Sequence, residues 1–249
     1  MNDNKKALLS FNKAISLDTA YDLSYNYRAD YFFFMNDYEN ALLDYNKSIE
    51  LDSTYHYYYY DRADLHSQMG NQDLALVDLN KAEIYISESE FSEYYAKLGR
   101  VYQSLKDFDK AFINFQKSID LDTTNSSPLY YRAKLYEEIG EYENQRKDLL
   151  SAITLDPEDP EGYYFLALSY YQNNNIFRAI NYISKSIEKF SAGGYIISGD
   201  KLGEEISLSE LYLKRADIYK KADAKDMACE SYKLACDLGE CEMFNENCK

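Results

Sequence analysis

A ladder of alanines, spaced by the length of a two-helix repeat, constrains this chain most. The ladder alanines are Ala7, Ala41, Ala75, Ala111, Ala179 and Ala228. The first two intervals are 34 residues, the third is 36, and the fourth, 68, spans two units with Gln145 in the slot between. The last interval is 49, which is one unit plus 15 inserted residues. This period predicts a stack of helix pairs in which every unit buries its core against its neighbours.

Small residues also mark the partner helix of each unit. They stand twelve positions before the ladder, at Ala29, Ala63, Gly99, Ala133, Ala167 and Ala216. One small residue on each helix lets the two helices approach closely, and a larger side chain would overpack the contact at a cost of roughly 1–3 kcal/mol. Bulky apolar residues follow the ladder by four positions and small residues by seven, which is the spacing of one helix face. We therefore expect each unit to be two antiparallel helices in close contact.

The unit spanning residues 92–125 carries the fullest form of a known pattern. It contains Tyr95, Leu98, Gly99, Tyr102, Ala111 and Phe115, and it resembles the tetratricopeptide repeat. The departures recur along the chain: tryptophan is absent, tyrosine or leucine takes its place, and only Pro157 matches the family proline. The resemblance implies an all-α, right-handed superhelical solenoid of antiparallel helix pairs. Its concave face, built by the first helix of each pair, would hold a peptide or another protein.

The resemblance covers nearly the whole chain, which we interpret as a single domain, residues 1–249. In order, its segments are a half repeat 1–21, repeats 22–55, 56–91, 92–125, 126–159 and 160–189, an insertion 190–208, a last repeat 209–239 and a capping segment 240–249. The insertion holds four of the nine glycines. We expect it to form a loop or hairpin that folds over the end of the groove.

Arginine replaces the family leucine in four units, and three of these arginines have an aspartate sixteen residues later. The pairs are Arg28 with Asp44, Arg62 with Asp78, and Arg132 with Asp148. The units with Leu98 and Leu166 have the uncharged Asn114 and Tyr182 at that distance. We predict a forked ion pair between the two helices of a unit, which lets a buried arginine keep its charge. The fourth, Arg215, has no such aspartate, and coincidence among so few units is the alternative.

The resemblance places positions 2, 5, 9 and 12 of each unit on the concave face. The candidate partner-binding residues are Asn26, Asp30, Tyr60, Asp64, Arg100, Tyr130, Lys134, Tyr164 and Tyr171. We expect a bound segment to lay a carboxylate on Arg100 and Lys134 and to stack on the tyrosines, which offer rigid area at low entropic cost. The alternative is that the tyrosines have no functional role, because the chain contains 28 of them. The carboxylate clamp of chaperone-binding family members is not reproduced, since the first unit has Asn26 and Asp30.

Charge and hydropathy exclude several partners. The net charge of −16 is spread over the whole length, which opposes binding to phosphate backbones and anionic membranes, so no nucleic acid partner is predicted. No apolar run is long enough to span a bilayer. The first residues lack a signal-peptide core because Ser10, Asn12 and Lys13 interrupt it. The sequence as it stands indicates a cytoplasmic protein, or a secreted or periplasmic one that has lost its leader.

No catalytic residue, cofactor or metal site is predicted. The two histidines, His56 and His66, are expected to be structural because one opens a unit and the other takes an aromatic core position. The many carboxylates are typical of the solvated face of helical repeats. The cysteines lack the CxxC spacing of metal sites. The sequence therefore does not indicate an enzyme.

All four cysteines, Cys229, Cys236, Cys241 and Cys248, lie in the last 21 residues. The first two are about 10 Å apart along one helix, too far to join each other. If Gly239 ends that helix and a short antiparallel helix follows, Cys236 pairs with Cys241 and Cys229 with Cys248. Four reduced core thiols are the alternative, whereas disulfides would imply an oxidising compartment. The segment ACESYKLACDLG also resembles terminal units of repeat proteins from bacterial cell envelopes, which favours secretion.

The sequence thus predicts a non-catalytic scaffold that binds a protein or peptide in a concave groove. The alternative is a structural assembly component. The chain begins in the second helix of a unit, so Phe11, Ala14 and Ile15 would lack a partner helix. The open half repeat would then pair with another copy or with upstream sequence.

Overall fold

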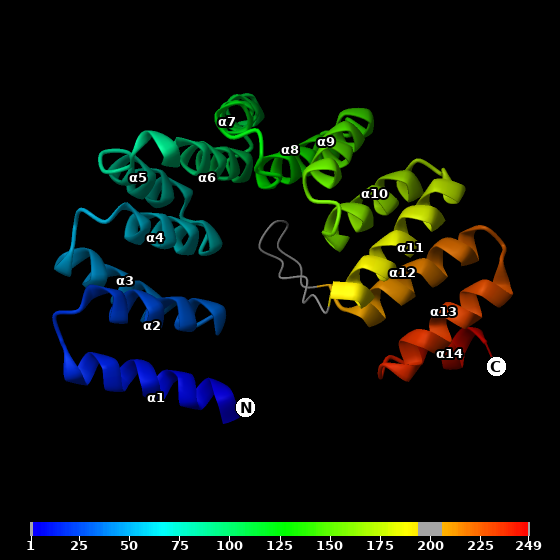
Figure 1. Ribbon diagram of the computed structural model, residues 1–249, viewed down its shortest axis with the longest axis horizontal. Coiled ribbons are helices and arrows are strands. Elements are labelled where there is room, and N and C mark those ends of the chain that lie inside the picture. The colour runs from blue at the N-terminus through cyan, green and yellow to red at the C-terminus, as the bar shows by residue number, and fades with distance from the viewer. Residues whose placement is uncertain (1, 194–205, 249) are drawn as a thin grey trace. The chain divides into compact units, whose positions relative to one another are not determined.

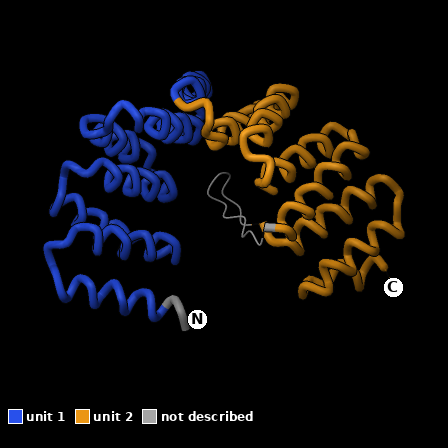
Figure 2. Tube along the Cα trace, viewed as in Figure 1, with its two compact units in different colours: residues 1–121 blue, residues 122–249 orange. Residues whose placement is uncertain are grey.

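The computed structural model describes residues 2–193 and 206–248, and every regular element in this part of the chain is a helix. The chain divides into two compact units, unit 1 with residues Met1–Leu121 and unit 2 with residues Asp122–Lys249 (Figure 2). The all-α solenoid class predicted from the sequence is confirmed. A single domain that continues across the boundary between the units stays a prediction.

Unit 1 is a run of antiparallel helices, each packed on the next (Figure 1). Its helices are α1 (Asn2–Leu17), α2 (Asp22–Phe34), α3 (Tyr38–Leu51), α4 (His56–Gln68), α5 (Gln72–Ala82), α6 (Phe91–Ser104) and α7 (Phe108–Leu121), with the 3₁₀ turn η1 (Glu88–Glu90) before α6. The first helices of the predicted repeats are α2, α4 and α6. The predicted repeat starts at residues 22 and 56 are the first residues of α2 and α4, whereas residue 92 is the second residue of α6.

Unit 2 continues the same alternation. Its helices are α8 (Ser127–Glu138), α9 (Tyr142–Leu155), α10 (Pro160–Gln172), α11 (Ile176–Gly193), α12 (Leu208–Lys221), α13 (Lys225–Asp237) and the short α14 (Glu242–Asn247). Helix α11 extends into the predicted insertion, and residues 194–205 of that insertion lie outside the described residues. The expected loop over the groove is among them.

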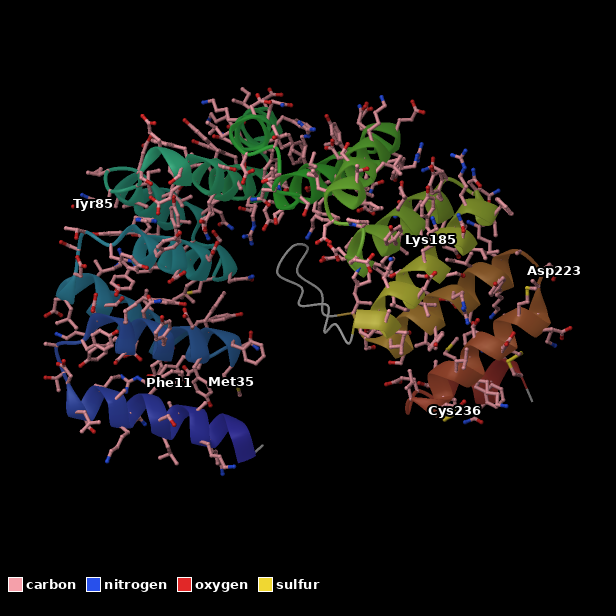
Figure 3. All side chains as sticks on the ribbon, in the orientation of Figure 1. Phe11, Met35, Tyr85, Lys185, Asp223 and Cys236 are labelled. Carbon is pink, nitrogen blue, oxygen red and sulfur yellow. A yellow bond between two sulfur atoms is a disulfide. The ribbon has the colours of Figure 1, made fainter. Side chains whose placement is uncertain are left out.

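Helix α1 packs one face on α2. Phe11, labelled in Figure 3, contacts Tyr31 of α2 with ring centroids 6.2 Å apart. Phe11, Ala14 and Ile15 are therefore half-buried against the following helix, although the sequence suggested that they lack a partner. The opposite face of α1 leaves Leu9 and Leu17 exposed, at 67% and 76%.

The predicted small residues lie at the helix–helix contacts. Ala29 of α2 and Ala41 of α3 are completely buried, as are Ala75 and Ala111 at the equivalent positions of later repeats. The tightest contact is at Gly99 of α6, where a Cβ would lie 2.5 Å from two ring carbons of Phe115. Close approach of the two helices therefore depends on the absence of side-chain atoms at this position.

Gly99→Ala is expected to lower the free energy of unfolding by roughly 1–3 kcal/mol, because Phe115 is fully buried and its ring must shift. Urea denaturation followed by circular dichroism measures this change. The double variant Gly99→Ala/Phe115→Leu should regain part of the loss, since other repeats combine alanine with leucine there, as in Ala63 with Leu79. Equal stability of Gly99→Ala and the parent would contradict the close contact.

Each helix pair closes through a turn with one left-handed residue, five positions before the ladder. These residues, with φ between 57° and 81°, are Asn36, Gly70, Lys106, Gly140, Asn174 and Asp223. The following residue donates its backbone N–H to the carbonyl five positions earlier, as from Asp37 to Phe32 at 2.8 Å. This bond ends the first helix. Glycine and asparagine adopt the left-handed conformation readily, whereas a lysine does so at some cost.

The three predicted arginine–aspartate pairs are present inside their units. Arg62 Nε and Nη2 donate to the two oxygens of Asp78 at 2.8 and 2.6 Å. The pairs Arg28–Asp44 and Arg132–Asp148 have the same forked geometry, at 2.6–2.7 Å. The remaining nitrogen of Arg62 donates to Asn46 of the preceding repeat at 2.6 Å. Each fork therefore joins two helices, and this bond adds a link between repeats.

Tyrosine at the family tryptophan position makes a recurring contact. The hydroxyls of Tyr59 and Tyr163 donate to the backbone carbonyls of Ser53 and Pro157, each six residues upstream, at 3.1 Å. Tyr25 donates in the same way to the equivalent carbonyl at 3.3 Å. The tyrosine therefore ties the first helix to the loop before it.

The C-terminal cap of unit 2 is closed by two disulfides. They join Cys229 with Cys248, and Cys236, labelled in Figure 3, with Cys241. Between them, Met243 and Phe244 of α14 pack against Ala216, Ala228 and Tyr232. The cap thus covers the apolar end of the last helix pair and holds α14 there covalently.

Candidate partner-binding face

Hydrogen bonds connect the first helices of unit 1 to one another. Asn26 of α2 donates through Nδ2 to Asp61 of α4 at 2.9 Å, and Lys97 of α6 donates to Asp64 of α4 at 2.7 Å. We call the surface formed by α2, α4 and α6 the first-helix face of unit 1. Polar and charged groups of three successive repeats meet on it.

Asp64 of α4 lies beside two cationic side chains of α6, Lys97 and Arg100. Lys97 Nζ lies 2.7 Å and Arg100 Nη1 3.7 Å from its oxygens. Desolvation raises the pKa of Asp64, but the two cations outweigh it and hold the pKa below its usual value. Arg100 is 41% exposed. Any partner carboxylate that binds Arg100 therefore competes with an aspartate already beside it.

Asp30 and Asp61 on this face each accept a hydrogen bond from a neutral side chain rather than from a lysine or arginine. Tyr45 donates to Asp30 at 2.8 Å. Desolvation raises the pKa of Asp30 above its usual value, although this hydrogen bond lowers it in part. Desolvation also raises the pKa of Asp61 to about 7, opposed by the Asn26 hydrogen bond and by Lys97, and reinforced by the charges of Asp30 and Asp64. The ionised forms of Asp30 and Asp61 are thus energetically unfavourable in the free protein.

Tyr60 is completely buried. Its ring packs edge-to-face with Tyr57, at a centroid distance of 5.9 Å, and Lys97 Nζ lies 5.2 Å above it. Its hydroxyl has no hydrogen-bond partner among the described residues. The ring therefore supports Lys97 from within the helix stack, and it offers no open surface for stacking a bound segment.

The candidates on α8 and α10 belong to unit 2. Tyr130 is completely buried and donates to Asp159 at 3.1 Å, and Tyr164 is nearly buried. Lys134 is exposed on α8. Tyr171 of α10 is half-buried beneath Lys221 of α12, whose Nζ lies 4.3 Å from the ring centroid. The two cations expected to share one carboxylate, on α6 and α8, are thus in separate units.

The sixth position of the repeat also contributes to this face, although it is not among the predicted partner-binding positions. Asp61 and Lys97 both occupy it, and both bond to a neighbouring first helix. The set of positions taken from the family resemblance contains the fifth and ninth but not the sixth. A charged residue at the sixth position of consecutive units was the signal available.

The described residues contain no group of three or more His, Cys, Asp or Glu side chains placed to hold a metal ion. None of the helices in this part of the chain combines the length and apolar character that crossing a bilayer requires.

Comparison with known proteins identifies the repeat. The tetratricopeptide repeat model matches residues 24–55, 92–125 and 128–159, close to three of the predicted repeats. The helix pairs also superpose on solved repeat proteins over almost the whole chain. The chain therefore contains tetratricopeptide repeats. Its repeats belong to a class that generally forms non-catalytic scaffolds for interactions between proteins.

Three solved structures illustrate the likeness in fold. The Cut9–Hcn1 hetero-tetramer of the APC/C has a TM-score of 0.68 at 13% identity, over 99% of this chain and 46% of that chain. A tetratricopeptide repeat protein from Parabacteroides merdae ATCC 43184 has a TM-score of 0.63 at 21% identity, over 98% and 91%. PilW, a type IV pilus biogenesis factor, has a TM-score of 0.67 at 15% identity, over 90% and 97%. At these identities the likeness shows the fold.

Proposed function

We propose that this protein is a non-catalytic scaffold that binds a peptide or protein segment on the first-helix face of unit 1. The observation that carries the proposal is the concentration of polar groups from three successive first helices on one surface, with Asn26, Asp61 and Lys97 bonded across the repeats. A protein that only needed these helices to pack would have no use for half-buried carboxylates there, because their desolvation is unfavourable. The two disulfides support a location in an oxidising compartment.

Panning a random peptide display library against the protein tests this function. Binders should bind the parent and lose about tenfold or more in affinity for Glu93→Lys/Arg100→Glu, which reverses two exposed charges on α6. The matched control, Asp73→Lys/Lys81→Glu, reverses two exposed charges on the second helix α5 and should bind like the parent. Failure to recover binders, or binders insensitive to the α6 variant, would rule out this face.

Self-association through α1 is a second candidate, favoured by the exposure of Leu9 and Leu17. Light scattering of the parent and of Leu9→Lys/Leu17→Lys separates the two functions. A parent oligomer that becomes a monomer in this variant would support assembly through α1. A monomeric parent at high concentration would remove it.

A further inference from the structure

Three hydrogen-bond acceptors come together between α2 and α4 with too few donors. Asp30 receives one hydrogen bond, from Tyr45, and Asp61 receives one, from Asn26, among the described residues. Asn26 itself is 5% exposed, and its Oδ1 is buried without a hydrogen-bond partner in this part of the chain. Two carboxylates and a buried amide oxygen thus retain accepting capacity that no described donor uses.

No cation is committed to this group. The two basic side chains of α6 that reach α4, Lys97 and Arg100, both form their ion pairs with Asp64. Desolvation and the like charges of Asp30 and Asp64 disfavour the ionised form of Asp61, and the Asn26 hydrogen bond and the charge of Lys97 offset them only in part. Burial of unpaired carboxylates is costly, and the natural remedy is a cation that also donates hydrogen bonds. Lys97 therefore compensates the negative charge of this group only in part, and the group still lacks hydrogen-bond donors.

We propose that Asp30, Asp61 and Asn26 bind an arginine side chain of a partner polypeptide. This inference rests on the proposed function of the first-helix face of unit 1. A guanidinium has five donors in one plane and no acceptor, so it can serve separate oxygens of two carboxylates and an amide at once. An ammonium has three donors at one point and fits a dispersed set of acceptors less well.

The charged groups around Asp61 set how binding depends on pH. They are Asp30 on α2, Tyr45 on α3, Asp64 on α4 and Lys97 on α6. Because the pKa of Asp61 is about 7 in the free protein, its carboxyl is mostly neutral at pH 6 and mostly ionised at pH 8. A guanidinium favours the ionised form and keeps its own charge throughout. Affinity is therefore expected to rise roughly tenfold from pH 6 to pH 8.

The probe is a fluorescein-labelled peptide of alanine and serine with three arginines, measured by fluorescence anisotropy. Its matched control replaces each arginine with citrulline, which is neutral and similar in shape. We expect the arginine peptide to bind the parent, and Asp61→Asn to weaken it about tenfold or more with loss of the pH dependence. Asp73→Asn removes one exposed carboxylate on α5 and should change neither. Circular dichroism checks that each variant is folded.

Several results would overturn the inference. Equal binding of the citrulline peptide, or unchanged binding to Asp61→Asn, would exclude recognition of a guanidinium at this place. Displacement of the arginine peptide from the parent, but not from Asp61→Asn, by millimolar CaCl₂ at constant ionic strength would assign the group to an inorganic cation instead. If panning yields face-specific peptides without arginine, the proposed function survives and the arginine site does not. If panning yields no face-specific peptide, both fail.

Discussion

Asp78→Ala is expected to lower the free energy of unfolding by about 3–5 kcal/mol. The Asp78 side chain is 3% exposed, and both of its oxygens accept hydrogen bonds from Arg62. His66 Nε2 also lies 3.7 Å from one of them. Alanine would leave the guanidinium of Arg62 partly buried without its counter-charge and would open a cavity between α4 and α5. Urea denaturation of the parent and the variant measures the difference.

The chain itself supplies the control for this variant. Repeat 92–125 has Leu98 and Asn114 at the positions of Arg62 and Asp78. The double variant Arg62→Leu/Asp78→Asn therefore places the same uncharged pair between α4 and α5. We expect this double variant to recover most of the stability, because removing both charges avoids an unpaired one. If Asp78→Ala unfolds at the same urea concentration as the parent, the fork contributes nothing to stability.

Loss of the Cys229–Cys248 disulfide has the second-largest expected effect. Cys229→Ser/Cys248→Ser removes a link between residues 19 apart in sequence, which in the chain-entropy description stabilises by about 3 kcal/mol. Release of α14 would also expose the apolar cluster around Tyr232. Thermal melting, with hydrogen exchange of α12 and α13 as the local measure, reports the change.

The second disulfide provides the comparison. Cys236→Ser/Cys241→Ser opens a link between residues only five apart, so the expected loss is smaller, about 2 kcal/mol. A reducing agent should destabilise the parent and leave a variant without cysteines unchanged. A parent whose melting temperature does not respond to reduction would show that the four thiols are free in solution.

The repeat architecture could be predicted from the sequence because close contacts recur at fixed spacing. Ala41 and its equivalents mark positions where no larger side chain fits, and the structure places them in the core. The fork of Arg62 and Asp78 was also predictable, because a buried charge needs a partner of opposite charge. Three of the repeats with arginine at this position have an aspartate sixteen residues later, and the repeats with leucine do not. Both patterns follow from packing inside one unit.

The candidate face was harder to predict, because its geometry depends on contacts between units of the stack. The sequence placed Tyr60 on an open aromatic row, yet the ring is buried beneath Lys97. It also assigned Arg100 to a partner carboxylate, whereas Asp64 already lies beside it. Tyrosine serves equally as core and as surface, and periodicity cannot tell which side of the ring faces solvent. The hydrogen-bond acceptors Asn26, Asp30 and Asp61 come from two successive repeats, so the residue pattern within one repeat does not reveal that they lie together.

The left-handed turns have a consequence for biosynthesis. Each helix pair is closed by a turn such as the one at Asn36, and its two helices lie within about thirty consecutive residues, here Asp22–Leu51. Contacts this local form early and fast. Every pair can therefore begin to assemble while later parts of the polypeptide are still being translated, each new pair docking on the one that emerged before it.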